Sequence, residues 1–284
     1  MERFIASRRS IKGVTWILQG VPLDMTVSRF HGTSEGPRTI RRESRHLETF
    51  STLLLGELQD VPFADVGDIE LVPGDLHLSL ETIKAVSSSF FRRGLKVATL
   101  GGEHLATLPV LEAASEVYPG MAVIHLDAHA DLRDRYRGTK KNHATVMRRV
   151  AERCLASPSL LFQFGIRSAS ADEYRWGKEN TSFFPLELSA PLRDVISMLG
   201  RRPVYLSLDI DIVDPGEAPG TGTPEPCGFS AREVLQALTL MKDLCMIGFD
   251  IVEVSPPNDI NGITSVLAAG LTRECLIMWG RGDS

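Results

Sequence analysis

Short and almost continuous apolar segments recur along the chain, and they constrain the fold more than any other feature of the sequence. Segments of this kind are typical of parallel β-strands that helices cover on both faces. The predicted strands are 15–19, 97–100, 122–127, 160–164, 204–209 and 246–251, with a weaker candidate at 64–66. Longer segments with helical periodicity separate them.

The ends of several helices can be located from capping residues. Ser170 and Ser230 are each followed three residues later by Glu, which is the capping-box pattern of a helix N-terminus. Further predicted helices are 80–93, 144–154 and 262–277. Alternation of strands and helices predicts an α/β fold, as one domain over residues 1–284, in which helices cover both faces of a parallel sheet.

Composition excludes several classes of protein. The chain has 284 residues, 43% hydrophobic and 24% charged, so it can bury a core without disulfides or a structural metal. Its net charge of −5 argues against a nucleic-acid partner. The four cysteines lack metal-type spacing and are predicted to be thiols in a reducing compartment. We find neither a signal peptide nor an apolar segment long enough to cross a bilayer, so a cytoplasmic location and no membrane partner are expected.

Acidic and histidine side chains gather where three predicted strands end. Asp or His occupies alternate positions at the ends of strands 122–127 and 204–209, and a His follows strand 97–100 beyond two glycines. These residues are His104, Asp127, His129, Asp131, Asp209 and Asp211. Alternate residues of an extended segment project from the same side, and ligands of open α/β sheets bind outside the carboxyl ends of the strands.

The six residues predict a site for two divalent metal ions. Four close carboxylates cannot all stay ionised without a counter-charge, which two divalent cations would supply. Oxygen ligands with a minority of imidazole and no thiolate favour Mn²⁺ over a structural Zn²⁺. Any single Asp could instead cap a helix or form a turn, but the repetition at separate strand ends favours metal binding. His125, deeper in its strand, is interpreted as a core residue or one that supports a ligand.

Several motifs resemble those of the ureohydrolase family, which includes arginases and agmatinases, and the agmatinase branch most closely. They are Gly101-Gly-Glu-His104, His125-Leu-Asp-Ala-His-Ala-Asp131, Gly165-Ile-Arg-Ser168, Ser207-Leu-Asp-Ile-Asp-Ile-Val-Asp-Pro215 and Gly248-Phe-Asp-Ile-Val-Glu-Val-Ser-Pro256. The resemblance extends from about residue 14 to about residue 271. It implies the arginase-like three-layer α/β/α fold with a mainly parallel eight-stranded sheet.

The resemblance also implies a binuclear cluster of two Mn²⁺ per chain, in which each of the six residues has a place. His104 and Asp131 would bind one ion, His129 and Asp211 the other, and Asp127 and Asp209 would bridge the two.

Three residues receive further roles from the resemblance. Glu253 would bind the substrate guanidinium, His143 would contact substrate and shuttle protons, and Asp131 would help to stabilise the tetrahedral intermediate. Without the resemblance, Glu253 could be a surface acid and His143 a loop residue. Two positions depart from the family pattern, because Glu103 replaces a frequent Asp and Leu105 a frequent Ser.

The implied reaction is hydrolysis of the guanidino group of agmatine to urea and putrescine, which belongs to polyamine biosynthesis. Alternatives are another guanidino hydrolase (aminopropylagmatine ureohydrolase, guanidinobutyrase or arginase) or a non-catalytic metal-binding paralogue. Loops 26–32 and 133–142 are predicted to read the length of this small-molecule substrate. A homo-oligomer, as trimer or hexamer, is implied, and residues 281–284 are predicted to be a frayed tail.

Overall fold

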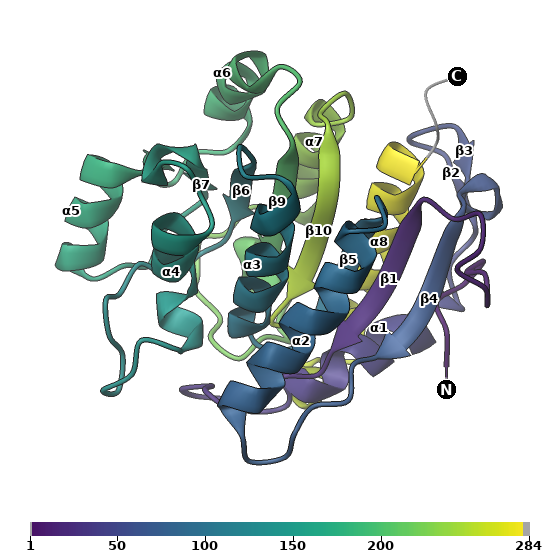
Figure 1. Ribbon diagram of the computed structural model, residues 1–284, viewed down its shortest axis with the longest axis horizontal. Helices are drawn as coiled ribbons and strands as arrows, with labels where there is room; N and C mark the ends of the chain where they lie inside the picture. Colours follow the sequence, from purple (N-terminus) through teal and green to yellow (C-terminus); the bar gives the residue numbers. More distant parts are fainter. Residues whose placement is uncertain (1, 281–284) are drawn as a thin grey trace.

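The computed structural model describes residues 2–280, so the predicted tail lies outside the described residues. Its centre is a parallel sheet (Figure 1). The strands of this sheet are β1 (Trp16–Val21), β4 (Phe63–Asp68), β5 (Lys96–Gly101), β6 (Ala122–Leu126), β7 (Leu161–Phe164), β8 (Ser182–Phe184), β9 (Val204–Asp209) and β10 (Met246–Val252). Their order across the eight-stranded sheet is β4-β1-β5-β10-β9-β6-β7-β8, and all neighbours pair in parallel. Short strands β2 (Phe50–Ser51) and β3 (Gly56–Glu57) form a separate antiparallel pair.

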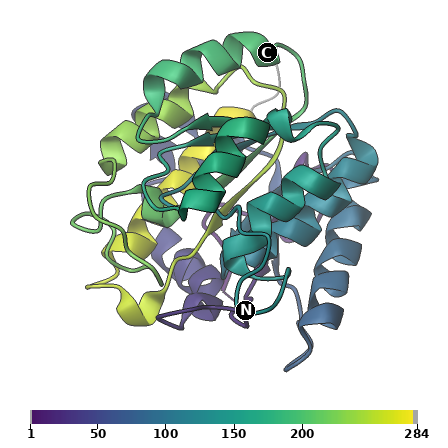
Figure 2. The same ribbon diagram turned by 90° about the vertical axis from the view of Figure 1, so that its left-hand side faces the viewer.

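Helices cover both faces of the sheet, and the layers can be followed in Figures 1 and 2. The helices are α1 (Gly36–Ser44), α2 (Leu76–Phe91), α3 (Thr107–Val117), α4 (Val146–Arg153), α5 (Ala171–Asn180), α6 (Ser189–Leu199), α7 (Ala231–Leu240) and α8 (Ile263–Gly280). Alternate side chains of the strands point to opposite faces. Thus Trp16 and Leu18 of β1 pack in a core with α1, α6, α7 and α8, whereas Ile17 packs in a second core with α2, α3 and α4.

The predicted strands are all present, with boundaries that differ by a few residues. Both capping boxes are confirmed: the Oγ atoms of Ser170 and Ser230 accept hydrogen bonds from the N–H groups of Glu173 and Glu233. The predicted start of helix 80–93 is wrong, because the Asp75 side chain caps the N-terminus of α2 at Leu78 N–H. Three helices, α1, α3 and α6, and three short strands, β2, β3 and β8, were not predicted.

The strand order places four strands side by side in the middle of the sheet, namely β5, β10, β9 and β6. β10 is the last strand in the sequence, yet it lies between β5 and β9. The carboxyl ends of these four strands therefore meet at one edge, where ligands bind in open α/β folds.

Two predictions about the whole chain can be compared with the structure. All four cysteines are free thiols, Cys154 and Cys275 buried and Cys227 and Cys245 exposed. None of the helices within residues 2–280 combines the length and apolar character that a membrane span requires.

Candidate active site

His104 lies at the centre of a first group of carboxylates. It begins the 3₁₀ turn His104–Ala106, which Gly102 and Glu103 separate from the end of β5, and it is buried. Its Nδ1 atom lies 3.1, 3.2 and 3.3 Å from Oδ2 atoms of Asp127, Asp209 and Asp131, respectively. Within residues 2–280 this buried nitrogen has no well-formed hydrogen-bond partner. Three carboxylate oxygens thus converge on this nitrogen. Metal ligands around a shared cation would have the same arrangement.

His129 and Asp211 form a second group beside the first. The Nδ1 atom of His129 lies 2.8 Å from Oδ2 of Asp211 and 3.6 Å from Oδ1 of Asp127. Asp127 therefore faces both groups, with Oδ2 toward His104 and Oδ1 toward His129. The structure thus brings all six predicted metal ligands together, and Asp127 has the position expected of a bridging carboxylate.

These side chains do not converge through the extended backbone that their alternate spacing predicted. Strand β6 ends at Leu126, and Asp131 has a positive φ of 53°. After β9 the chain turns into the 3₁₀ helix Ile210–Ile212, and Oδ1 of Asp209 accepts the N–H of Asp211 at 2.9 Å. Asp209 is therefore both a capping residue and a member of the cluster.

The electrostatics of the cluster favour bound cations. Burial and the neighbouring carboxylates raise the pKa of Asp209 well above its ordinary value, and they also raise the pKa of Asp211. Burial lowers the pKa of His104, but the surrounding carboxylates outweigh it and raise that pKa well above its usual range. All three pKa shifts show that uncompensated negative charge is costly here. Carboxylates and imidazoles without thiolates fit a binuclear site for divalent ions.

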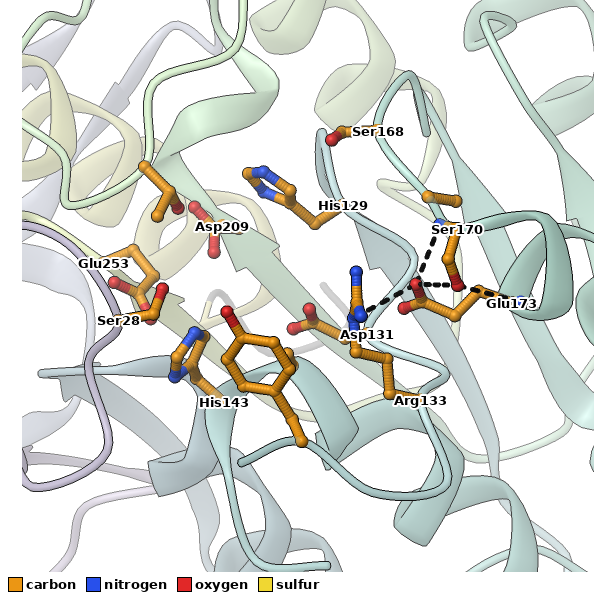
Figure 3. Close-up of a pocket in the computed structure, with 14 residues that line it drawn as sticks. Ser28, His129, Asp131, Arg133, His143, Ser168, Ser170, Glu173, Asp209 and Glu253 are labelled. Atoms are coloured by element: carbon orange, nitrogen blue, oxygen red, sulfur yellow. Dashed lines mark hydrogen bonds and ion pairs between the residues drawn. The ribbon is translucent and has the colours of Figure 1, made fainter. Parts of the chain in front are cut away.

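A pocket with a volume of about 280 Å³ opens beside the cluster (Figure 3). The predicted loops 26–32 and 133–142 contribute Ser28, Arg133 and Tyr136 to its wall. His143 and Glu253 also line the pocket, as do four polar residues that were not predicted as part of the site: Ser168, Ser170, Glu173 and Thr223.

Glu253 is held next to His104 by backbone interactions. It follows β10 with a φ of 64°, and its N–H donates to the Gly102 carbonyl at 2.8 Å. Its Oε1 accepts the His104 N–H at 2.7 Å. Burial raises the pKa of the Glu253 carboxyl to about 8. A planar guanidinium could supply the missing positive charge through two hydrogen bonds to one carboxylate.

His143 is half-buried in the pocket wall, and a short hydrogen-bond chain positions it. Its N–H donates to Oγ1 of Thr26 at 3.1 Å. Glu103 in turn accepts hydrogen bonds from the hydroxyl and N–H of Thr26 and from the N–H of Met25. Burial raises the pKa of Glu103 to about 7. Glu103, which departs from the family pattern, thus supports the loop that carries Thr26, the hydrogen-bond partner of His143.

Further buried polar residues support His104, and sequence reasoning missed their role. The Nε2 atom of His104 lies 3.0 Å from Oγ of Ser207, which donates to Oδ1 of Asp250 at 2.7 Å. Oδ2 of Asp250 accepts the Tyr205 hydroxyl at 3.0 Å. Ser207 and Asp250 are paired in the register of β9 and β10. Only knowledge that these strands are neighbours could have identified this contact.

Comparisons with known proteins agree with the fold and the site. Residues 14–278 match the Arginase family. Agmatinase of Bacillus subtilis (strain 168) is 40% identical over 277 residues, which cover 96% of this chain and 95% of that protein. Guanidinobutyrase of Pseudomonas aeruginosa is 35% identical and covers 90% of this chain and 84% of its own. The crystal structure of agmatine ureohydrolase of Thermoplasma volcanium has a TM-score of 0.88 at 31% identity, covering 98% of this chain and 94% of that one.

Fold, site and relatives together define a hydrolase that acts on guanidino groups. The chain belongs to the arginase family, so the predicted family resemblance and the arginase-like α/β fold are confirmed.

Proposed function

We propose that this chain hydrolyses the guanidino group of agmatine to urea and putrescine, with two Mn²⁺ per chain. The observation that carries the proposal is the buried cluster of four carboxylates and two imidazoles beside the carboxylate of Glu253. The carboxylate of Glu253 lies next to the site for the two divalent ions. It can therefore pair with a planar cationic group that approaches these ions. The greater identity to the agmatinase than to the guanidinobutyrase supports agmatine as the substrate.

Each residue of the site has a defined task in this reaction. The ions would be held by His104 and Asp131, by His129 and Asp211, and by Asp127 and Asp209 between them. When bound, they supply an activated water and Lewis-acid stabilisation of developing charge.

The remaining tasks fall to side chains that line the pocket. Glu253 accepts hydrogen bonds from the guanidinium and sets its carbon over the cluster. Asp131 accepts a hydrogen bond from the tetrahedral intermediate, and His143 passes a proton between solvent and the leaving amine.

One observation favours a second candidate, a substrate whose distal end is a carboxylate. Arg133 lines the pocket, with its guanidinium 5.0 Å from the ring centroid of Tyr136. Its Nε lies 3.3 Å from Oε2 of Glu173, but that carboxylate also accepts hydrogen bonds from Ser170 and Leu132. A cation in the wall suits a guanidino acid such as guanidinobutyrate.

The physiological setting belongs to the same proposal. We place the enzyme in the cytoplasm, in polyamine biosynthesis, as a homo-oligomer (trimer or hexamer) without a nucleic-acid or membrane partner. The net charge of −5 and the family membership support this assignment.

The decisive experiment measures urea release from Mn²⁺-loaded protein with agmatine, aminopropylagmatine, arginine and guanidinobutyrate. We expect the highest kcat/KM with agmatine. Asp127→Ala serves as the control, because it removes the carboxylate that faces both groups and should lose both metal and urea release. Preference for guanidinobutyrate would select the second candidate, and two bound Mn²⁺ without urea from any substrate would contradict both.

A further inference from the structure

His125 is a buried imidazole that the proposed reaction does not use. It lies in β6, two residues before Asp127, and is fully buried. Nitrogen and oxygen atoms of His104, His125 and Asp127 lie within 4.8 Å of one another, close enough to hold an ion. Two roles are therefore open to His125: it binds a metal ion itself, or it holds a metal ligand in place.

The hydrogen bonds of Gln163 determine which nitrogen of His125 carries the proton. Gln163 pairs with His125 in the register of β6 and β7, and it is also fully buried. Its amide nitrogen donates to the Ala130 carbonyl at 2.8 Å, and its Oε1 accepts the Thr181 hydroxyl at 3.3 Å. A carbonyl can only accept, so the amide orientation is determined.

The same amide nitrogen lies 3.0 Å from Nδ1 of His125. Since that nitrogen donates its second N–H there, Nδ1 of His125 must be an unprotonated acceptor. The proton of the neutral ring then lies on Nε2, which is 2.7 Å from Oδ2 of Asp127. A protonated nitrogen donates a hydrogen bond and offers no lone pair to a cation.

We propose that His125 is a positioning residue, which orients the bridging carboxylate of Asp127 through a hydrogen bond that Gln163 imposes. This inference rests on the proposed metal centre. The His129 N–H binds the other oxygen of Asp127, so both ends of the carboxylate are held while each keeps a lone pair for an ion. Gln163 also holds Ala130, which lies between His129 and Asp131, so one amide orients both the bridge and the turn that carries two further ligands.

Four variants test the proposal through metal binding. His125→Phe keeps the ring but removes the donor, and His125→Gln restores an N–H near the position of Nε2. Gln163→Leu removes the group that selects the tautomer without touching Asp127. Gln19→Leu is the matched control, because Gln19 is equally buried in β1 but donates to Ser87 and Thr99 instead.

Mn²⁺ affinity is measured by calorimetric titration, and the geometry of the pair by the EPR spectrum of the loaded protein. Circular dichroism of the metal-free proteins checks the fold. Loss of a hydrogen bond to a metal ligand typically weakens metal binding roughly 10- to 100-fold. We expect Mn²⁺ affinity to fall by this factor in His125→Phe and Gln163→Leu, together with a change in the exchange-coupled EPR spectrum. In His125→Gln we expect Mn²⁺ affinity to be largely restored.

Other results would overturn the proposal in distinguishable ways. If His125 were a ligand, His125→Phe would lose one Mn²⁺ per chain while Gln163→Leu would bind as tightly as wild type. Wild-type affinity and spectrum in both variants would show that the hydrogen bond does not matter. Failure of the wild-type protein to bind Mn²⁺ would overturn the proposed function as well.

Discussion

Single residues of the site combine a buried carboxyl group with an unfavourable backbone conformation. Asp131 and Glu253 have positive φ values of 53° and 64°, a region that costs non-glycine residues about 1–3 kcal/mol each. Hydrogen bonds to Gly102 and His104 hold Glu253 in this conformation. Backbone strain of this kind concentrates where a side chain must be aimed, which here is toward the cluster.

Glu253→Gln tests the proposed contact with the guanidinium. The amide oxygen can still accept the His104 N–H, so we expect an intact fold and unchanged Mn²⁺ content. The lost charge weakens two charge-assisted hydrogen bonds of about 1.5 kcal/mol each, which lowers kcat/KM for agmatine about 100-fold. Steady-state kinetics and metal analysis of the same sample check this, and activity within threefold of wild type would contradict the assigned role.

At the scale of elements, the turn after β5 determines where His104 and Glu253 lie. The Gly102 N–H donates to the Val21 carbonyl, and the Glu103 N–H donates to that of Leu23. A Cβ on Gly102 would lie 2.1 Å from the carbonyl oxygen of Leu23 and 2.8 Å from the backbone nitrogen of Leu23. The close approach of two backbones therefore requires glycine at this position.

Gly102→Ala should destabilise the protein, because neither backbone can move without displacing the cluster. We expect the free energy of unfolding to fall by about 2–3 kcal/mol, with weaker Mn²⁺ binding. Gly270→Ala is the matched control, since nothing lies within 4 Å of the added Cβ in α8. That substitution should raise stability by up to about 1 kcal/mol. Urea denaturation measures the free energy of unfolding of both variants. Equal changes in Gly102→Ala and Gly270→Ala would refute the steric argument.

At the scale of the whole molecule, the proposed ions connect strands that are distant in sequence. Ligands follow β5, β6 and β9, and burial together with neighbouring carboxylates raises the pKa of Asp209 and Asp211, so the charges of these two carboxylates oppose folding when no cation balances them. Metal binding and global stability should therefore be coupled.

Removal of Mn²⁺ with a chelator at neutral pH should lower the Tm. An ion present at a hundred times its Kd contributes about 2.7 kcal/mol, which corresponds to a decrease of about 5–10 °C for a chain of this size. Differential scanning calorimetry with and without added Mn²⁺ measures this change. The Tm of Asp127→Ala should not respond to Mn²⁺, and an unresponsive wild-type protein would argue against a binuclear site.

Much of the fold and the candidate site follows from local sequence patterns. Buried strands are locally recognisable because apolar side chains cover both faces, and the boxes at Ser170 and Ser230 mark helix starts because their hydrogen bonds span only three residues. The three-residue strand β8 and helices α1, α3 and α6 lack such strong local signals. The six clustered residues were found because they lie at the carboxyl ends of three buried strands, β5, β6 and β9.

Only the tertiary structure decided which of these local pieces meet. The position of β10 between β5 and β9 places Glu253 beside His104, and the pairing of β6 with β7 places Gln163 on His125. Strand pairing joins residues far apart in the chain through backbone groups that every residue carries, so no side-chain pattern encodes the neighbour. The sequence thus determined which strands form and which chemistry each strand end carries. Packing and sheet register determined the partners of those groups, and with them the site.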